Sequence, residues 1–313
     1  MTLWEAIVLG IVQGLTEFLP ISSTAHLAIV PSLLGWQDPG AAFTAVIQCG
    51  TLAAVVVSFR SDLVRITRAF CRGLVERNPW GTQDARLAWM MIVATIPIVV
   101  FGLLFKEQIR RDFRSLNVIA GALIGLAIVL ALAETLLIAR TRRHQTPRGL
   151  AETTWWDALV VGIAQSMALI PGTSRSGVTI TGGLLQGLTR PAAARFSFLL
   201  SLPAIFAAAV HEMIDERELL FSSGDQIFNL VVSTLVAGVV GYLAIAFLMA
   251  YLRTHTTAIF IAYRIVLGIA LLVLVGTGRL PNQCVTVPTT SSMPQAHDVA
   301  DGRTVKDFSR EGF

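Results

Sequence analysis

The residues best suited to chemistry gather in two short polar motifs, each inside a long apolar stretch. The first motif, QGLTEFLPISSTAH, begins at Gln13. Gln13 and Glu17 are four residues apart, and side chains at that spacing share one face of a helix. A carboxylate in apolar surroundings is costly and is a functional candidate by default. We therefore predict that Gln13 and Glu17 belong to a binding or catalytic site.

The end of the first motif predicts a helix break followed by a second helix start. Pro20 interrupts the helix, and Ser22, Ser23 and Thr24 all suit a helix N-cap. A helix that starts there directs free N–H groups and the positive end of its dipole towards an anion. His26 lies three residues beyond Ser23, on the same face, where it can act as proton donor, base or nucleophile.

The second motif, PGTSRSGVTITGG, repeats the pattern of a break followed by a helix start. Ser174 and Ser176 supply hydroxyl groups, and Gly172 and Gly177 allow close approach of the backbone. Arg175 adds a planar, permanently charged guanidinium that suits phosphate. The serines also suit a purely structural role as helix caps. Together the two motifs predict one composite site for a phosphate group.

Composition indicates that the elements around these motifs are membrane helices. Of 313 residues, 54% are hydrophobic and 14% are charged, whereas soluble domains have about 45–50% and about 25%. The arginines lie in short loops, which does not suggest nucleic acid as a partner and does suggest a bilayer. Crossing a bilayer takes roughly 20 residues, and six predicted spans meet this length: 41–59, 87–105, 116–138, 192–210, 227–251 and 258–276.

The two motifs lie in broken apolar regions, at about 4–34 and 156–188, that we expect to be re-entrant helical hairpins. Residues 4–13, WEAIVLGIVQ, recur as WDALVVGIAQ at 156–165, which is an offset of 152. PISS then faces PGTS at an offset of 151, which pairs Thr24 with Arg175.

Three predicted spans separate the copies, so the repeat is expected to have inverted topology, with the site near the membrane midplane. We expect one catalytic membrane domain over 1–279, with halves at about 1–138 and 150–279, and a polar, disordered tail over 280–313.

Loop charges predict the orientation. Loop 60–86 has six arginines against three acidic residues, and loop 139–149 has four arginines and no acid. Loop 211–226 has five acidic residues against one arginine. The positive-inside rule makes the basic loops cytoplasmic, although loop 106–114, which is also basic, is then external. The site is expected to face the external side of the membrane.

Several other residues are expected to lie near span ends or to pair structurally, without chemistry of their own: Glu5, Glu134, Asp157, Arg195, His211 and Arg264. The GxxxG sequence at Gly121 and Gly125 predicts close packing between helices.

The motifs resemble undecaprenyl-diphosphate phosphatase, the bacitracin-resistance family of bacterial membranes. The likeness extends to about residue 278 and rests on Gln13–Glu17, Pro20–His26 and Pro171–Gly177. Looser likeness is found in RFSFLLSLPA and AYRIVLG further along the chain. The resemblance implies hydrolysis of undecaprenyl diphosphate to the monophosphate, which recycles the lipid carrier of peptidoglycan synthesis and confers bacitracin resistance.

The resemblance also implies that Glu17, Ser23, His26 and Arg175 are the functional residues. It implies a divalent cation, Mg²⁺ or Ca²⁺, held by Glu17 with Gln13, although Gln13 replaces the Glu of many members. Two further departures from the family pattern are Ala25 in place of a frequent Gly and a longer tail. A homodimer is one expected assembly.

The sequence is compatible with three routes to hydrolysis: attack by Ser23 activated by His26, attack by His26 itself, or attack by water activated by Glu17 and His26. A secondary transporter or lipid flippase is the main alternative, because inverted repeats with broken helices are typical of transporters. The acid-phosphatase-like lipid phosphatases are a weaker alternative, since their Lys–Arg–Pro element and the His after the Arg have no counterpart in this chain.

Overall fold

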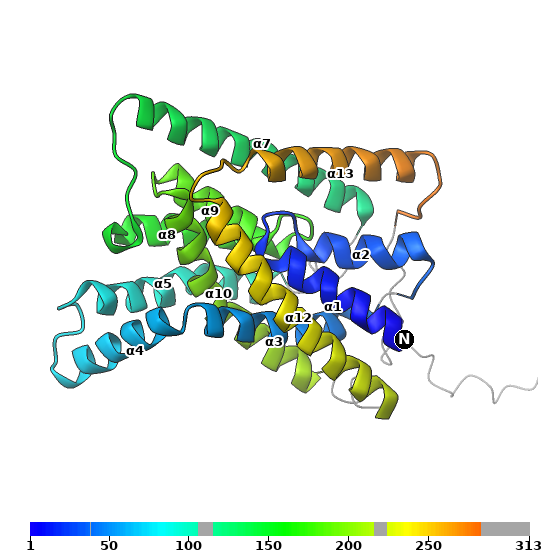
Figure 1. Ribbon diagram of the computed structural model, residues 1–313, viewed down its shortest axis with the longest axis horizontal. Helices are drawn as coiled ribbons and strands as arrows, with labels where there is room; N and C mark the ends of the chain where they lie inside the picture. Colours follow the sequence, from blue (N-terminus) through cyan, green and yellow to red (C-terminus); the bar gives the residue numbers. More distant parts are fainter. Residues whose placement is uncertain (38, 106–114, 216–223, 283–313) are drawn as a thin grey trace, which may run out of the picture.

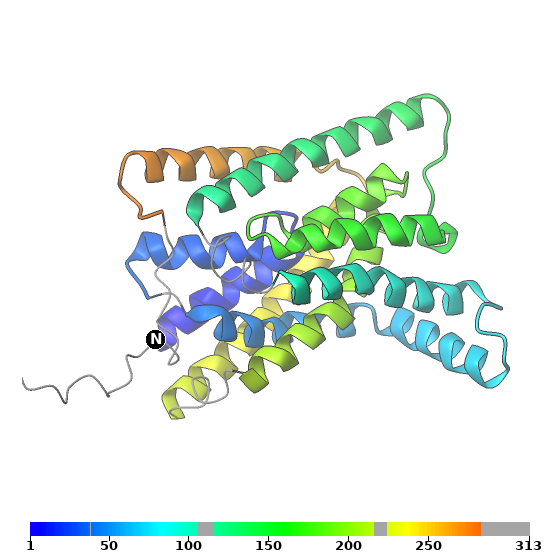
Figure 2. The ribbon, with the colours of Figure 1, turned by 180° about the vertical axis from the view of Figure 1, so that it is seen from behind.

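A computed structural model describes residues 1–37, 39–105, 115–215 and 224–282. In these ranges the chain is a bundle of α-helices with two short 3₁₀ turns (Figures 1 and 2). The elements are α1 Leu3–Phe18, α2 Ser23–Leu34, α3 Gly40–Ser58, α4 Arg60–Val75, α5 Gln83–Leu104, α7 Leu116–Arg142, η2 Leu150–Glu152, α8 Trp155–Ser166, η3 Met167–Leu169, α9 Arg175–Leu185, α10 Arg190–Asp215, α12 Gly224–Tyr251 and α13 Ala258–Gly276.

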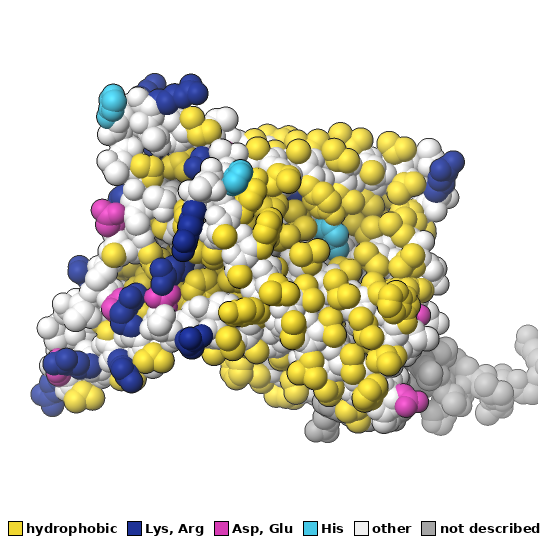
Figure 3. Space-filling view, in the orientation of Figure 1, with side chains coloured by type: hydrophobic (Ala, Val, Ile, Leu, Met, Phe, Trp, Pro, Cys, Tyr) yellow, Lys and Arg dark blue, Asp and Glu magenta, His cyan; other side chains and the backbone are white. Residues whose placement is uncertain are grey.

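All six predicted spans coincide with helices. Five helices, α5, α7, α10, α12 and α13, are long and apolar enough to cross a membrane. The sixth predicted span is α3, which continues into α4 after a bend of 79°. On the face of the bundle drawn in Figure 3, hydrophobic side chains cover most of the surface away from the left-hand end. Large hydrophobic side chains on its outside are therefore expected to face lipid.

Charged side chains gather at one end of the bundle, around α4 and the start of α8 (Figures 1 and 3). At that end Arg195 Nε donates to Asp62 Oδ2 at 2.7 Å, and Arg190 Nε donates to Glu134 Oε1 at 2.7 Å. The structural pairing predicted for Arg195 and Glu134 is therefore confirmed. Glu5, near the N-terminus, belongs to the capping box that starts α1.

Asp157 is paired with Arg148 in the first turn of α8, outside the candidate spans. Arg148 Nη1 and Nη2 donate to the two carboxylate oxygens, each at 2.7 Å, and Thr154 N donates to Oδ2 at 2.8 Å. Burial of Asp157 alone would raise the pKa of its carboxyl group, but these hydrogen bonds outweigh burial and lower that pKa below its ordinary value. The structural role predicted for Asp157 is confirmed.

Both predicted helix breaks are present, and they share one unusual backbone geometry. Ser22 is the N-cap of α2 and has φ 77°, and Ser174 is the N-cap of α9 and has φ 68°. Few residues other than glycine adopt a positive φ. Each serine accepts a hydrogen bond through its Oγ from the backbone N–H three residues later, Ala25 N at 3.4 Å and Gly177 N at 3.2 Å.

The equivalent caps set the register of the sequence repeat. Ser22 and Ser174 are 152 residues apart, the same offset as in the preceding helices. The predicted offset of 151, which paired Thr24 with Arg175, is therefore wrong: the residue equivalent to Arg175 is Ser23. The error arose because residue identity favoured the alignment of Ser23 with Ser174. The positive φ that identifies the caps cannot be recognised from the residue types.

Glycine at equivalent positions lets the two copies pack alike. Gly10 in α1 faces α12, where an added Cβ would lie 2.7 Å from the Ser233 carbonyl oxygen. Gly162 in α8 faces α5, where an added Cβ would lie 2.6 Å from the Ala94 carbonyl oxygen. Only a residue without a Cβ permits these approaches. Thus α1 packs along α12 as α8 packs along α5.

The main hydrophobic core lies where the first break meets α3 and α10. Phe18, directly after Glu17, is fully buried and meets Phe198 edge to face, with ring centroids 5.3 Å apart. Phe59 contacts the same ring at 6.0 Å. This packing fixes the end of α1, and with it the position of Glu17.

One prediction needs correction, and several others fall outside the described residues. An added Cβ at Gly121 or Gly125 would meet no described atom within 4 Å, so the GxxxG sequence does not form the predicted close packing within the described chain. The disordered tail over 280–313 stays a prediction; at its start, Asn282 O accepts from Leu116 N at 2.8 Å. Four parts of the chain lie outside the described residues: loop 106–114, residues 216–223 of loop 211–226, the His211 side chain and the tail from residue 283.

Candidate active site

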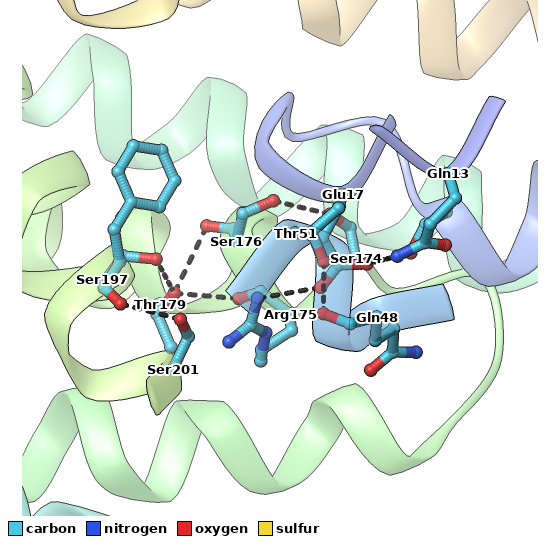
Figure 4. Close-up of polar contacts among 12 residues, drawn as sticks. Gln13, Glu17, Gln48, Thr51, Ser174, Arg175, Ser176, Thr179, Ser197 and Ser201 are labelled. Atoms are coloured by element: carbon cyan, nitrogen blue, oxygen red, sulfur yellow. Dashed lines mark hydrogen bonds and ion pairs between the residues drawn. The ribbon is translucent and has the colours of Figure 1, made fainter. Parts of the chain in front are cut away.

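Glu17 is the centre of a buried polar cluster that joins the two motifs (Figure 4). Arg175 Nη2 donates to Glu17 Oε1 at 2.8 Å. Gln13 Nε2 and Ser23 Oγ both donate to Glu17 Oε2, at 2.9 and 2.6 Å. The carboxylate is only 7% exposed. The structure thus brings Gln13, Glu17, Ser23 and Arg175 together, as the composite site predicted.

Two buried polar atoms at this cluster lack a partner among the described residues: Arg175 Nη1 and Gln13 Oε1. A buried donor or acceptor left without a hydrogen bond is costly, on the order of 1–3 kcal/mol. The free guanidinium N–H groups suit an anion, and the free amide oxygen suits a cation or a donor. Arg175 and Gln13 are therefore arranged for a ligand.

Each helix start that flanks the cluster is bonded to the opposite helix break. Gly172 N donates to Thr24 Oγ1 at 3.4 Å, and Ser176 Oγ donates to the Leu19 carbonyl oxygen at 3.2 Å. The first N–H groups of any helix lack intrahelical acceptors. Two such helix starts beside one guanidinium create a positive region in which an anion is stabilised.

The predicted substrate-binding residues mostly have structural contacts in this state. Ser22 and Ser174 cap helices, and their hydroxyls lie 3.1 Å from those of Thr24 and Ser176. Gly172, at φ 95°, approaches α7, where an added Cβ would lie 2.5 Å from the Ile119 carbonyl oxygen. At Gly177 an added Cβ would lie 3.1 Å from Arg264 Nη1. The glycines therefore serve helix packing here.

His26 is not bonded to the carboxylate cluster. Its Nδ1 lies 2.7 Å from the Ser22 carbonyl oxygen, and its Nε2 lies 2.6 Å from the Tyr263 hydroxyl. Among the described residues, no hydrogen bond joins His26 to Ser23 or Glu17. The predicted activation of Ser23 by His26 therefore has no support in this geometry. The hydrogen bond between Ser23 and Glu17 supports activation of Ser23 by Glu17 instead.

Arg264 is the residue whose position the sequence analysis missed. It is fully buried in α13, six residues after the helix begins at Ala258. Its Nη1 donates to the carbonyl oxygens of Pro20 and Thr173, both at 3.1 Å. Its Nη2 donates to Gly172 O at 3.0 Å and to α7. One guanidinium thus holds both helix breaks in place.

A smaller hydroxyl network supports the second helix start and was also missed. Thr179 Oγ1 donates to the Arg175 carbonyl oxygen at 2.8 Å and lies 2.5 Å from Ser197 Oγ (Figure 4). The signal was available for Thr179, because it stands four residues after Arg175 and so shares a helix face with it. Ser197 comes from α10, and nothing in the sequence indicated that contact.

The set of ligands for a divalent cation is small. Within the described ranges, no group of three or more His, Cys, Asp or Glu side chains is close enough to hold a metal ion. Glu17 and the unpartnered Gln13 Oε1 supply oxygen atoms, and Mg²⁺ is often held by one or two carboxylates together with substrate phosphates. The residues therefore fit a cation that binds jointly with a phosphorylated ligand.

The fold and the site define a polytopic α-helical membrane protein with a buried polar site suited to an anion. A protein-family model described as bacitracin resistance protein BacA matches residues 6–270, and the chain belongs to this family. Over 280 residues the chain is 58% identical to an undecaprenyl-diphosphatase of Chloroherpeton thalassium, covering 90% of this chain and 99% of that protein. Undecaprenyl-diphosphatases of Prosthecochloris aestuarii and Chlorobaculum tepidum are each 57% identical over the same shares.

Proposed function

We propose that this protein hydrolyses undecaprenyl diphosphate to undecaprenyl phosphate and inorganic phosphate. This activity recycles the lipid carrier of peptidoglycan synthesis and confers bacitracin resistance. The observation that carries the proposal is the contact of Glu17 with both Ser23 and Arg175 inside an apolar bundle. The names of the relatives, undecaprenyl-diphosphatase, support the substrate.

In the proposed reaction the terminal phosphate displaces part of the contact between Glu17 and Arg175. Arg175 Nη1 and the N-termini of α2 and α9 then bind the phosphate oxygens and stabilise the charge of the transition state. This stabilisation is expected to dominate catalysis, because phosphoryl transfer requires little covalent chemistry from the protein.

Ser23 is the nucleophile that the geometry favours. Its Oγ donates to Glu17 Oε2 at 2.6 Å, so Glu17 can take the proton as Oγ attacks the terminal phosphorus. The bond from that phosphorus to the bridging oxygen breaks, and undecaprenyl phosphate leaves with the bond electrons. The proton held by Glu17 passes to the departing lipid phosphate. Water then attacks the phosphoserine while Glu17 takes a proton from it, and the bond from phosphorus to Ser23 Oγ breaks as that proton passes to Oγ. Direct attack by water on the substrate, with the same base, is the alternative.

A divalent cation would be held by Glu17 and Gln13 Oε1 and would supply further charge neutralisation to the diphosphate. The repeat, with its shared caps and matching helix pairs, supports an inverted topology in which α1–α2 and α8–α9 are the two re-entrant hairpins. We further propose that the charged end of the bundle is cytoplasmic and that the site opens to the external side. The homodimer and the division into halves stay predictions.

The test is phosphate release from farnesyl or undecaprenyl diphosphate by the purified full-length protein in detergent, with and without EDTA. Glu17→Gln keeps the shape of the side chain but removes the base, and is expected to lower kcat by at least about 100-fold. Glu76→Gln, at the exposed C-cap that follows α4, is the matched control and is expected to behave as wild type. A phosphoenzyme that Ser23→Ala abolishes would establish the serine route.

Folded wild-type protein that binds the diphosphate lipid without releasing phosphate would refute the hydrolase and favour the transporter. Release that persists in EDTA would remove the cation from the mechanism and leave the rest.

A further inference from the structure

His26 has a defined hydrogen-bonding state that its partners dictate. The Ser22 carbonyl oxygen, 2.7 Å from Nδ1, can only accept, so Nδ1 has to be the protonated nitrogen. In the neutral ring Nε2 then has a lone pair, which accepts from the Tyr263 hydroxyl at 2.6 Å. The two rings are also nearly parallel, with centroids 5.7 Å apart. Tyr263 thus fixes both the direction and the plane of the imidazole.

His26 in turn supports a strained position at the first helix start. It holds the carbonyl of Ser22, the N-cap residue with φ 77°. A non-glycine residue in such a conformation persists only where its surroundings hold it. The chain of contacts from Tyr263 through His26 to Ser22 therefore ends at the N-terminus of α2, which faces the polar cluster.

Tyr263 is well placed to be a fixed support. It is adjacent to Arg264, whose guanidinium anchors the carbonyl oxygens of Pro20 and Thr173 in the two breaks. The backbone of α13 therefore holds the tyrosine in register with the site. The ring is 42% exposed on the outside of the bundle, so loss of its hydroxyl leaves no buried polar group on the tyrosine itself.

We propose that Tyr263 is a positioning residue for the proposed phosphatase reaction. Its hydroxyl orients His26, which holds the Ser22 carbonyl and so aims the N-terminus of α2 at the terminal phosphate. Tyr263 has no contact with the carboxylate cluster among the described residues, and it acts through His26 alone. The proposal rests on the proposed function for its kinetic consequence, but the contact itself can be measured independently.

The first experiment measures the contact. Protein labelled with ¹⁵N-histidine has five histidines, and His26→Ala identifies the resonances of His26. Tyr263→Phe is expected to shift the Nε2 resonance of His26 and to leave Nδ1 protonated. Tyr242→Phe is the matched control, because Tyr242 is 44% exposed on α12 and its hydroxyl has no hydrogen bond within the described ranges. An Nε2 resonance unchanged by Tyr263→Phe would overturn the proposal.

The second experiment is a double-mutant cycle on phosphate release from farnesyl diphosphate. Tyr263→Phe is expected to lower kcat/KM about two- to tenfold, the factor expected from one net hydrogen bond. In the His26→Ala background the same substitution is expected to have no effect, because residues that act through one contact are not additive. The melting temperature of Tyr263→Phe is expected to match that of Tyr242→Phe.

Two kinetic results would overturn the positioning role: wild-type kcat/KM in Tyr263→Phe, or an equal loss in the His26→Ala background. A wild type that releases no phosphate would instead refute the proposed function and the kinetic role with it, while the NMR contact would stand.

Discussion

Arg264→Lys tests whether the shape of one buried guanidinium organises the site. Arg264 donates five hydrogen bonds to carbonyl oxygens, of which Pro20, Gly172 and Thr173 lie in the two breaks. A lysine keeps the positive charge but has three N–H groups on a single atom. At least two of the five carbonyl groups therefore lose their charged donor.

The expected decrease in the free energy of unfolding follows from those two lost hydrogen bonds. Side-chain hydrogen bonds in membrane proteins average about 0.6 kcal/mol, and hydrogen bonds to charged groups in other proteins contribute about 1.5–3 kcal/mol each. Arg264→Lys should therefore lower the free energy of unfolding by about 1 to 6 kcal/mol. Phosphate release should fall further than the folded fraction does, because both helix starts lose their common anchor.

The assay is thermal unfolding in detergent together with phosphate release at a temperature where the variant is folded. Arg253→Lys, at an exposed position between α12 and α13, is the matched control and is expected to match wild type. If Arg264→Lys had the melting temperature of wild type and retained full activity, the geometry of the guanidinium would have no organising role. The reasoning from its five hydrogen bonds would then be refuted.

Two further predictions concern packing and pH. Gly162→Ala places a Cβ 2.6 Å from the Ala94 carbonyl oxygen and should destabilise the protein by about 1–3 kcal/mol; Gly121→Ala, which meets no described atom within 4 Å, should not lower the melting temperature. Equal melting temperatures for these two variants would contradict the close approach of α8 to α5. Asp157→Asn should cost about 1.5–3 kcal/mol at pH 7 through loss of charged hydrogen bonds to Arg148. Folding lowers the pKa of the Asp157 carboxyl group from its ordinary value of 3.8. Its contribution to the free energy of unfolding is therefore complete above that value and is lost as the pH falls through the lowered pKa. A difference in melting temperature between wild type and Asp157→Asn that did not narrow on acidification would contradict this stabilising role.

The spans and the breaks could be predicted because each depends on local sequence. Apolar length determines a span, and Pro20 with the hydroxyl residues that follow determines a break. The pairing of Glu17 with Arg175 was also accessible, since a buried guanidinium needs an anionic partner. These features need no knowledge of which helices are neighbours.

Contacts between distant segments could not be predicted in the same way. Tyr263 and His26 are 237 residues apart, and no pattern in the amino-acid sequence indicates that they are in contact. Arg264 did have a local signal, because an arginine inside an apolar span is rare and is a functional candidate. Its partners proved to be backbone carbonyl groups, however, and every residue has one, so no side-chain pattern identified them.

The anchoring of both breaks by Arg264 has a consequence for biosynthesis. The chain is made from its N-terminus, and α13 leaves the ribosome after every other described span. The carbonyl groups of Pro20 and Thr173 therefore lack this hydrogen-bond donor until α13 has been made. A nascent chain that ends before α13 contains Glu17, Ser23 and Arg175 but not the residue that sets their geometry. We therefore expect the site to be completed only after α13 is made, and a chain that stops before α13 to lack a competent site.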